Sequence, residues 1–377
     1  MSGAPTWVAV LVRVVAVVWT LGVGAVVVGA FVPRLPVVGF LGSFVAGQYP
    51  LHAGLAAVVA VALAGATWAV GSRGTGAALA LVAVVTVVAM AVVLAAQVRL
   101  ARSEGVSIDW ASALAATDQS GGRGPDLTTR YSAAPDLDLD LYRPAGPGPH
   151  PVMVWVHGGS WVRGERTDRA AAHRWLADRG VAVVAMTYRL PPPSPVGEGQ
   201  RRDVACAMAW VAEHAATEGL DPASVTLAGQ SAGATLALST ASALVAGERL
   251  GERPVAPPRA VAAFYPVVDM SSIAPSLQDA VFGGPVERFP DRRRAASPDA
   301  QVRAGLPPTL LVLGSADHFV FADRVIAYDR ALRAAGVPGR LLVVPYADHV
   351  FDFPFGSPGA QVARPVLARF LEGYGRA

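Results

Sequence analysis

The sequence contains no lysine and only one cysteine, and charged residues make up just 16% of it. A chain whose single cysteine is Cys206 can form no internal disulfide and offers no cysteine-based metal site. The basic residues are all arginines, and they are scattered except for residues 292–294, which we interpret as a solvated loop. With a net charge of only +3, this distribution does not indicate a nucleic-acid partner.

Hydrophobic residues account for 53% of the sequence, and the excess is concentrated in residues 1–98. Three segments of this region contain no charged residue and have close to the ~20 apolar residues that a bilayer-spanning helix requires: 14–32, 51–70 and 77–97. Such segments in succession are too long and too uniformly apolar for the core of a soluble domain. We therefore predict three transmembrane helices in a multi-pass integral membrane protein, with the lipid bilayer as a partner and the cell membrane as its expected location.

The apolar segment 35–48 is shorter, at about fourteen residues, and contains three glycines. We predict an interfacial or re-entrant loop there rather than a fourth span. The arginines flanking the three predicted helices divide almost evenly between the two sides of the membrane, so the side that holds the C-terminal domain stays open. Because the predicted spans carry no charged residue, we interpret them as an anchor and not as a transport path.

Residues 99–135 are polar and weakly periodic, and we predict a linker between the membrane region and a second domain at 136–377. In that domain short apolar runs alternate with helical stretches, which is typical of a mostly parallel sheet covered by helices on both faces, an α/β fold. The predicted strands are 137–141, 152–156, 181–186, 225–228, 260–264, 310–313 and 341–344, and the predicted helices are 170–178, 204–216, 234–245, 322–335 and 361–373.

The strongest local pattern is the pentapeptide Gly229-Gln230-Ser231-Ala232-Gly233. It follows the apolar run 225–228 and precedes a helical stretch, so Ser231 lies where a strand turns sharply into a helix. Small residues are needed two positions to either side of such a serine, because the strand and helix backbones crowd there. We predict that Ser231 is a nucleophile with an exposed hydroxyl.

A serine nucleophile needs a base within hydrogen-bond reach and an acid that orients the base. Asp317 follows the run 310–313 and His349 follows the run 341–344, so both lie past the carboxyl ends of predicted strands, where ligands bind in open parallel sheets. We predict that His349 is the base and Asp317 its acid. Asp269 is the competing acid, His318 is the competing base, and Asp348 is expected to cap a turn or to be solvated.

The oxyanion of a tetrahedral intermediate needs backbone N–H donors, and the segment after the run 152–156 can supply them. Its sequence is His157-Gly158-Gly159-Ser160-Trp161. We predict donation by the N–H groups of Gly159, Ser160 and Ala232. The glycines allow the backbone to approach the substrate, His157 is expected to brace the loop, and Trp161 either walls the substrate pocket or packs in the core.

These motifs, in this order, make residues 137–371 similar to the carboxylesterases and lipases of the α/β-hydrolase superfamily that resemble hormone-sensitive lipase. The resemblance implies an α/β-hydrolase fold with Ser231, His349 and Asp317 as a catalytic triad, and hydrolysis through an acyl-enzyme without cofactor or metal. It also implies a candidate lid at residues 266–308, where this superfamily often inserts cap elements. The third glycine common in the first motif is a serine here, and Gln230 occupies a position where aspartate or histidine is frequent.

We predict a membrane-anchored serine esterase or lipase that acts on short-to-medium acyl esters. Two alternatives share its chemistry: an acyltransferase that passes the acyl group to an envelope alcohol or sugar, and a hydrolase of amides or formamides. A third is a catalytically idle module that only binds. The oligomeric state stays open.

Overall fold

The computed structural model describes residues 5–117, 122–133 and 135–375. They form two compact units. The first unit contains the described part of Met1–Thr117 together with Gly314–Phe319 and Val343–Val362, and the second contains the described remainder.

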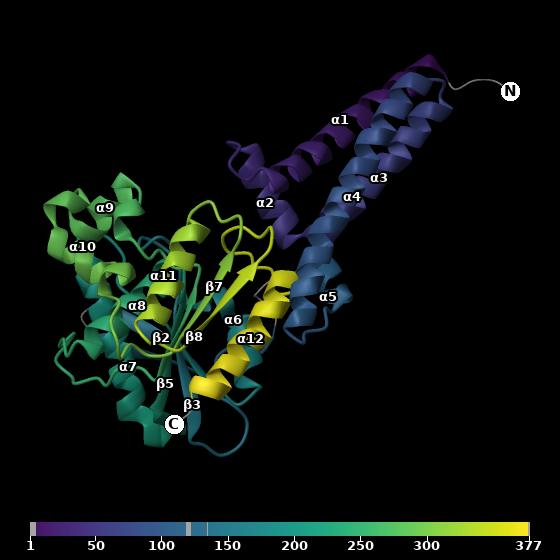
Figure 1. The fold of residues 1–377 in the computed structure, drawn as a ribbon. Helices are drawn as coiled ribbons and strands as arrows, with labels where there is room; N and C mark the ends of the chain where they lie inside the picture. Colours follow the sequence, from purple (N-terminus) through teal and green to yellow (C-terminus); the bar gives the residue numbers. More distant parts are fainter. Residues whose placement is uncertain (1–4, 118–121, 134, 376–377) are drawn as a thin grey trace. The chain divides into compact units, whose positions relative to one another are not determined.

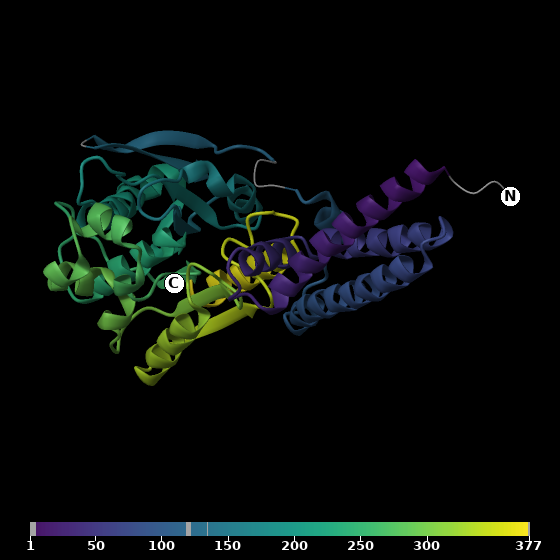
Figure 2. The same ribbon diagram turned by 90° about the horizontal axis from the view of Figure 1, so that it is seen from above.

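The first unit is built on three long helices, α1 (Thr6–Phe31), α3 (Pro50–Ala69) and α4 (Arg73–Ser103), which lie side by side (Figures 1 and 2). Each is long and apolar enough to cross a membrane, which confirms the three predicted helices of spanning length. α1 and α4 extend beyond the uncharged stretches and take in Arg13 and Arg99. Arginine is a good helix former, so a charge near a helix end does not stop the helix.

Most of the buried residues of this helical bundle are small, and many of its large apolar residues face outward. Ala16, Ala57 and Ala83 are fully buried, whereas Val18 is 67% and Leu81 is 68% exposed. A water-soluble bundle would bury its large side chains, because burial of apolar area is what stabilises it. Close packing through small residues with large apolar residues on the outside is typical of helices that pack in lipid.

Residues 35–48 differ from the prediction of a loop, since most of them form the short helix α2 (Val38–Gln48). Glycine makes its contact with α1 possible. A Cβ added at Gly29 would lie 1.9 Å from the carbonyl oxygen of Val38, and one added at Gly42 would lie 2.4 Å from the Cα of Gly29. The glycines therefore permit backbone contact between two helices rather than marking a loop. At 11 residues α2 is too short to span a bilayer.

The segment 99–135, predicted as a linker, contains regular structure. α4 continues to Ser103, the helix α5 (Trp110–Ala115) follows, and the strand β1 (Leu127–Ala133) pairs with β2 (Asp136–Tyr142). The α5 helix begins at an N-cap, Asp109, whose side chain accepts hydrogen bonds from the N–H groups of Ala111 and Ser112. The sheet therefore begins before residue 136, at Leu127.

An eight-stranded sheet runs in the order β1-β2-β4-β3-β5-β6-β7-β8. The remaining strands are β3 (His150–Val156), β4 (Ala182–Met186), β5 (Leu220–Gln230), β6 (Ala260–Phe264), β7 (Thr309–Gly314) and β8 (Gly339–Val344). β1 and β2 are antiparallel to their neighbours, whereas β4, β3, β5, β6 and β7 pair in parallel. Each strand predicted from an apolar run coincides with an observed strand, so the α/β fold with a mostly parallel sheet is confirmed.

Helices cover the sheet (Figures 1 and 2). They are α6 (Ala170–Ala177), α7 (Gly197–Glu218), α8 (Ala232–Val245), α11 (Ala322–Ala334) and α12 (Pro358–Tyr374). Every residue of β4 and of β6 is buried. Alternate residues of a strand point to opposite faces, so both faces of the sheet are covered at these strands.

The candidate lid at residues 266–308 is made of short helices. They are η2 (Met270–Ser272), α9 (Pro275–Phe282), η3 (Val286–Arg288), α10 (Pro290–Ala296) and η4 (Pro298–Gln301). The arginine cluster at 292–294 lies in α10 and not in a loop as predicted, because Pro290 at the first position starts a helical turn. Arg292 donates to the carbonyl oxygen of Phe282 at 2.8 Å, which links α10 to α9.

His173 of α6 is buried between two aromatic rings and is sensitive to acid. Its ring centroid lies 5.4 Å from that of Tyr142 and 5.5 Å from that of Trp155. Among the described residues, neither ring nitrogen has a hydrogen-bond partner. Burial, and secondarily the positive charge of Arg169, lowers the pKa of His173 from 6.5 to about 3. The folded protein therefore holds this ring neutral.

We expect His173 to make the folded state less stable as pH falls. Between pH 6.5 and about 3 the unfolded chain binds one proton that the folded ring does not, so stability is lost at up to about 1.4 kcal/mol per pH unit. A His173→Phe variant should lack this contribution. Urea unfolding of detergent-solubilised protein at pH 7.5 and 4.5 should show a loss about 2–3 kcal/mol larger in the wild type. Equal losses in the two proteins would contradict the assignment.

Candidate active site

Ser231 lies between β5 and α8 in a strained turn. Its backbone has φ 52° and ψ −122°, and positive φ is uncommon for a residue with a side chain. A Cβ added at Gly233 would lie 2.2 Å from the carbonyl oxygen of Val156, and one added at Gly229 would lie 2.6 Å from the carbonyl carbon of Gly233. Both glycines are therefore required by backbone crowding. The local structure has the geometry of a nucleophile elbow.

The loop after β3 lies directly against this elbow. β3 and β5 are parallel, and Val156 pairs with Gly229 at the end of both strands. A Cβ added at Gly158 would approach the side chain of Gln230 to 3.1 Å. The next three residues all have positive φ, namely Gly159 (120°), Ser160 (56°) and Trp161 (64°). This backbone cannot continue the sheet ladder, and it turns sharply beside the serine.

His157 braces the loop from inside the protein. It is fully buried, its ring stacks on that of Tyr188 with centroids 4.1 Å apart, and its Nδ1 lies 2.7 Å from the carbonyl oxygen of Gly158. The hydroxyl of Tyr188 donates to the carbonyl oxygen of His157 at 3.1 Å. Burial lowers the pKa of His157, so the ring is neutral and can donate from Nδ1. The expected bracing role agrees with this geometry.

Trp161, the last residue of the motif, is only 3% exposed. Its carbonyl oxygen accepts a hydrogen bond from the side-chain amide of Gln200 at 2.9 Å. Of the two predicted roles, this burial favours packing over lining of a pocket.

In the first unit, the loops after β7 and β8 bring Asp317 and His349 together. His349 Nδ1 lies 2.8 Å from Asp317 Oδ2, and the two residues are 9% and 8% exposed. A carboxylate accepts, so Nδ1 carries a proton and Nε2 is the nitrogen that can act as a base. The other oxygen of Asp317 accepts from the N–H of Phe319 at 2.8 Å.

The two loops are held in register by their backbones. Ser315 N–H donates to Val344 O, and Ala316 N–H donates to Ala347 O, both at 2.9 Å. A Cβ added at Gly314 would lie 2.2 Å from the Ala347 carbonyl oxygen, so only glycine fits there. This close approach fixes the distance between the loop that carries the acid and the loop that carries the histidine.

The competing residues have other partners. Asp269, the rival acid, caps η2 through the N–H of Ser271 and pairs with Arg324. His318, the rival base, pairs with Asp348 at 2.7 Å. The expectation that Asp348 caps a turn or is solvated needs correction, because this residue is fully buried and its carboxylate accepts hydrogen bonds from two loops.

Sequence reasoning missed a buried arginine beside the elbow. Arg169 is 2% exposed, its Nε donates to Gln230 Oε1 at 2.5 Å, and its Nη2 donates to the hydroxyl of Tyr265 at 2.7 Å. The only signal available in the sequence was Gln230, the unusual residue of the elbow motif. Its amide oxygen gives the guanidinium a neutral acceptor.

No group of three or more histidine, cysteine, aspartate or glutamate side chains in the described part of the chain is arranged to hold a metal ion.

Ser231 belongs to the second unit, and the His349–Asp317 pair belongs to the first.

Comparisons with known proteins agree on one class. Residues 139–332 match the BD-FAE family. The chain is 30% identical to an ethyl acetate hydrolase of Pseudomonas putida over 60% of this chain and 74% of that protein, and 29% identical to carboxylesterase NlhH of Mycobacterium tuberculosis over 63% and 78%.

Among solved structures, esterase 2 of Thermogutta terrifontis is similar, both with butyrate bound and phosphorylated by paraoxon. In each case the TM-score is 0.56 at 26% identity, covering 66% of this chain and 93% of that one. The fold is therefore that of the α/β-hydrolase esterases. The chain belongs to the BD-FAE family, and its relatives support an ester hydrolase.

Proposed function

We propose that the protein is a membrane-anchored serine hydrolase that cleaves carboxylic esters through an acyl-enzyme. The observation that carries the proposal is the elbow at Ser231, with its strained backbone and crowded glycines, next to the loop after β3. The His349–Asp317 pair supports it as the base and its orienting acid. The proposal requires that Ser231 Oγ comes within hydrogen-bond reach of His349 Nε2. The strand order favours this, because β5, β7 and β8 belong to one sheet.

In this mechanism His349 Nε2 takes the proton of Ser231 as its oxygen attacks the ester carbonyl carbon. Asp317 keeps the proton on Nδ1 and stabilises the imidazolium. The N–H groups of Gly159, Ser160 and Ala232 would donate to the oxyanion, and His349 would then return the proton to the departing alcohol. A water molecule activated by the same base releases the acid and restores the serine.

The three long helices support membrane anchoring. Their outward faces carry large apolar side chains, including Val18 and Leu81, which are about two-thirds exposed. Apolar surface of this extent marks a membrane or protein contact. Their length and their small-residue interior favour the membrane.

The relatives support short acyl esters as substrates. The Pseudomonas relative is named for ethyl acetate, and the Thermogutta esterase has been solved with butyrate. We propose esters with acyl chains of this size for the present chain. Product analysis with and without added alcohol separates hydrolysis from acyl transfer, and a matched amide separates esterase from amidase.

Covalent labelling tests the nucleophile. A fluorophosphonate probe should label the wild-type protein in detergent, and Ser231→Ala should abolish labelling because no activated hydroxyl remains. Ser239→Ala is the matched control, since Ser239 lies on α8 and its hydroxyl donates to the carbonyl oxygen of Leu236. Labelling that persists in Ser231→Ala would refute the assignment. Pretreatment with paraoxon should block the probe, as suggested by the Thermogutta structure.

A further inference from the structure

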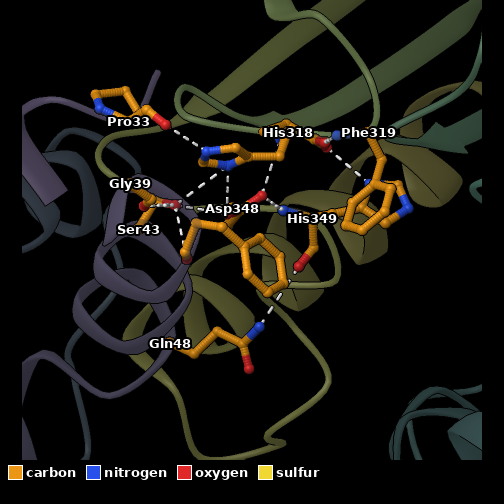
Figure 3. Close-up of polar contacts among 10 residues, drawn as sticks. Pro33, Gly39, Ser43, Gln48, His318, Phe319, Asp348 and His349 are labelled. Atoms are coloured by element: carbon orange, nitrogen blue, oxygen red, sulfur yellow. Dashed lines mark hydrogen bonds and ion pairs between the residues drawn. The ribbon is translucent and has the colours of Figure 1, made fainter. Parts of the chain in front are cut away.

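The first unit joins the catalytic loops to the apolar N-terminal helices. The loops carrying Asp317 and His349 and the helices α1, α2 and α4 all belong to this one compact unit. Figure 3 shows the polar contacts between them. An anchor would need no polar contact with these loops, so the contacts call for another explanation.

Asp348 is the centre of this contact. Its Oδ1 accepts from the N–H of His349 at 2.6 Å and from the N–H of His318 at 3.0 Å. Its Oδ2 lies 2.7 Å from His318 Nδ1 and 2.5 Å from the hydroxyl of Ser43 on α2 (Figure 3). The residue is fully buried, and four donors match the capacity of a carboxylate. A buried charge tolerates the loss of such donors poorly.

The Ser43 hydroxyl has competing acceptors on its own helix. It lies 2.9 Å from the carbonyl oxygen of Gly39 and 3.2 Å from that of Phe40. A hydroxyl carries a single proton, and the carboxylate is both the closest and the charged acceptor. We therefore assign the proton of Ser43 to Asp348.

His318 extends the link to the end of α1. Its Nδ1 faces the Asp348 carboxylate, and its Nε2 lies 2.5 Å from the carbonyl oxygen of Pro33. Both partners are hydrogen-bond acceptors, so the two ring nitrogens of His318 link the loop after β7 to the segment between α1 and α2.

Further contacts hold the histidine loop against α2 and α4. Gln48 at the end of α2 donates to the carbonyl oxygen of His349 at 3.4 Å, and Gln97 of α4 donates to that of Pro345 at 3.3 Å. A Cβ added at Gly47 would lie 2.7 Å from the Cα of Ala347. The backbones of the helix and the loop are therefore in direct contact, which only glycine allows.

We propose that the apolar N-terminal region positions the catalytic histidine, with Asp348 as the connecting residue and Ser43 as its contact on α2. This proposal rests on the proposed function of His349. Asp348 bonds the backbone of His349 rather than its ring, so it is a positioning residue and not a member of the triad. The membrane region is then part of the catalytic apparatus as well as an anchor.

Steady-state kinetics of the full chain in detergent, with p-nitrophenyl butyrate, tests this role. Ser43→Ala should lower kcat by about 10- to 100-fold and leave KM within about twofold, because a misplaced base slows proton transfer without weakening binding. Ser43→Thr keeps the hydroxyl and should retain most of the activity. The matched control is Thr86→Val, which removes a buried hydroxyl that donates to the carbonyl oxygen of Val82 within α4, and it should leave kcat unchanged.

Labelling rates separate this proposal from the proposed function. A wild-type protein that neither reacts with the fluorophosphonate probe nor hydrolyses the ester would refute the proposed function itself. If the wild type is reactive, a Ser43→Ala variant with the wild-type kcat and labelling rate would overturn the positioning role. A loss of kcat in Thr86→Val equal to that in Ser43→Ala would overturn it as well. If Ser43→Ala does not fold, Gln48→Leu serves instead, with a several-fold lower kcat and unchanged KM as the expected result.

Discussion

Replacing Ser231 with alanine should lower kcat for a short-chain ester by about 10⁶-fold, because the attacking oxygen is removed and no acyl-enzyme can form. The remaining reaction is direct attack by water, which substrate binding and the backbone donors accelerate by about 10³- to 10⁴-fold over the uncatalysed reaction. Initial rates with p-nitrophenyl butyrate in detergent measure the loss.

The Ser231→Ala substitution should leave the backbone of the elbow unchanged. Alanine keeps the Cβ and removes only the hydroxyl, so the crowding that Gly229 and Gly233 relieve is unchanged. Circular dichroism should therefore match the wild type. Ser239→Ala on α8 should keep wild-type kcat, since its hydroxyl donates to the carbonyl oxygen of Leu236 within the helix. A Ser231→Ala protein with more than about one-hundredth of the wild-type kcat would exclude Ser231 as the nucleophile.

The parts of the site that sequence reasoning anticipated are those governed by neighbours in the chain. The Ser231 elbow depends on glycines two residues away, and the loop from His157 to Trp161 depends on its own glycines. Asp317 and His349 were expected to meet because each follows an apolar strand, and parallel strands end at one edge of a sheet. The α/β fold was also predictable from local pattern, because short apolar runs alternate with helical stretches along the chain.

Long-range contacts were outside the reach of such reasoning. Ser43 and Asp348 are 305 residues apart in the chain, and neither residue stands in a local pattern that predicts a partner. A serine on an apolar helix and an aspartate beside a histidine are each ordinary alone. Arg169 and Gln230, which are 61 residues apart, are another such pair.

Short elements were missed for a different reason. Residues 35–48 contain three glycines, which favour a loop when the helix is considered by itself, but Gly29 and Gly42 allow α2 to pack on α1. The helix therefore gains from tertiary contact more than its glycines cost, about 1 kcal/mol each relative to alanine. α5 has only six residues, too few to show a helical period.

Replacing Asp317 with asparagine should lower kcat by about 10⁴-fold while leaving KM nearly unchanged. Asp317 Oδ2 lies 2.8 Å from His349 Nδ1, and a carboxylate there can only accept, which keeps the base nitrogen Nε2 free of a proton. The asparagine amide can instead donate to Nδ1. His349 would then carry its proton on Nε2 and could not take one from Ser231.

Asp269→Asn is the matched control, because it makes the same chemical change at the rival acid. Its carboxylate caps η2 and pairs with Arg324, so its loss should change the stability of that segment and leave kcat within a few-fold of the wild type. A larger loss of kcat in Asp269→Asn than in Asp317→Asn would reverse the assignment of the acid. The comparison isolates the tautomer effect, since both variants remove one negative charge and only Asp317→Asn alters the partner of the His349 ring.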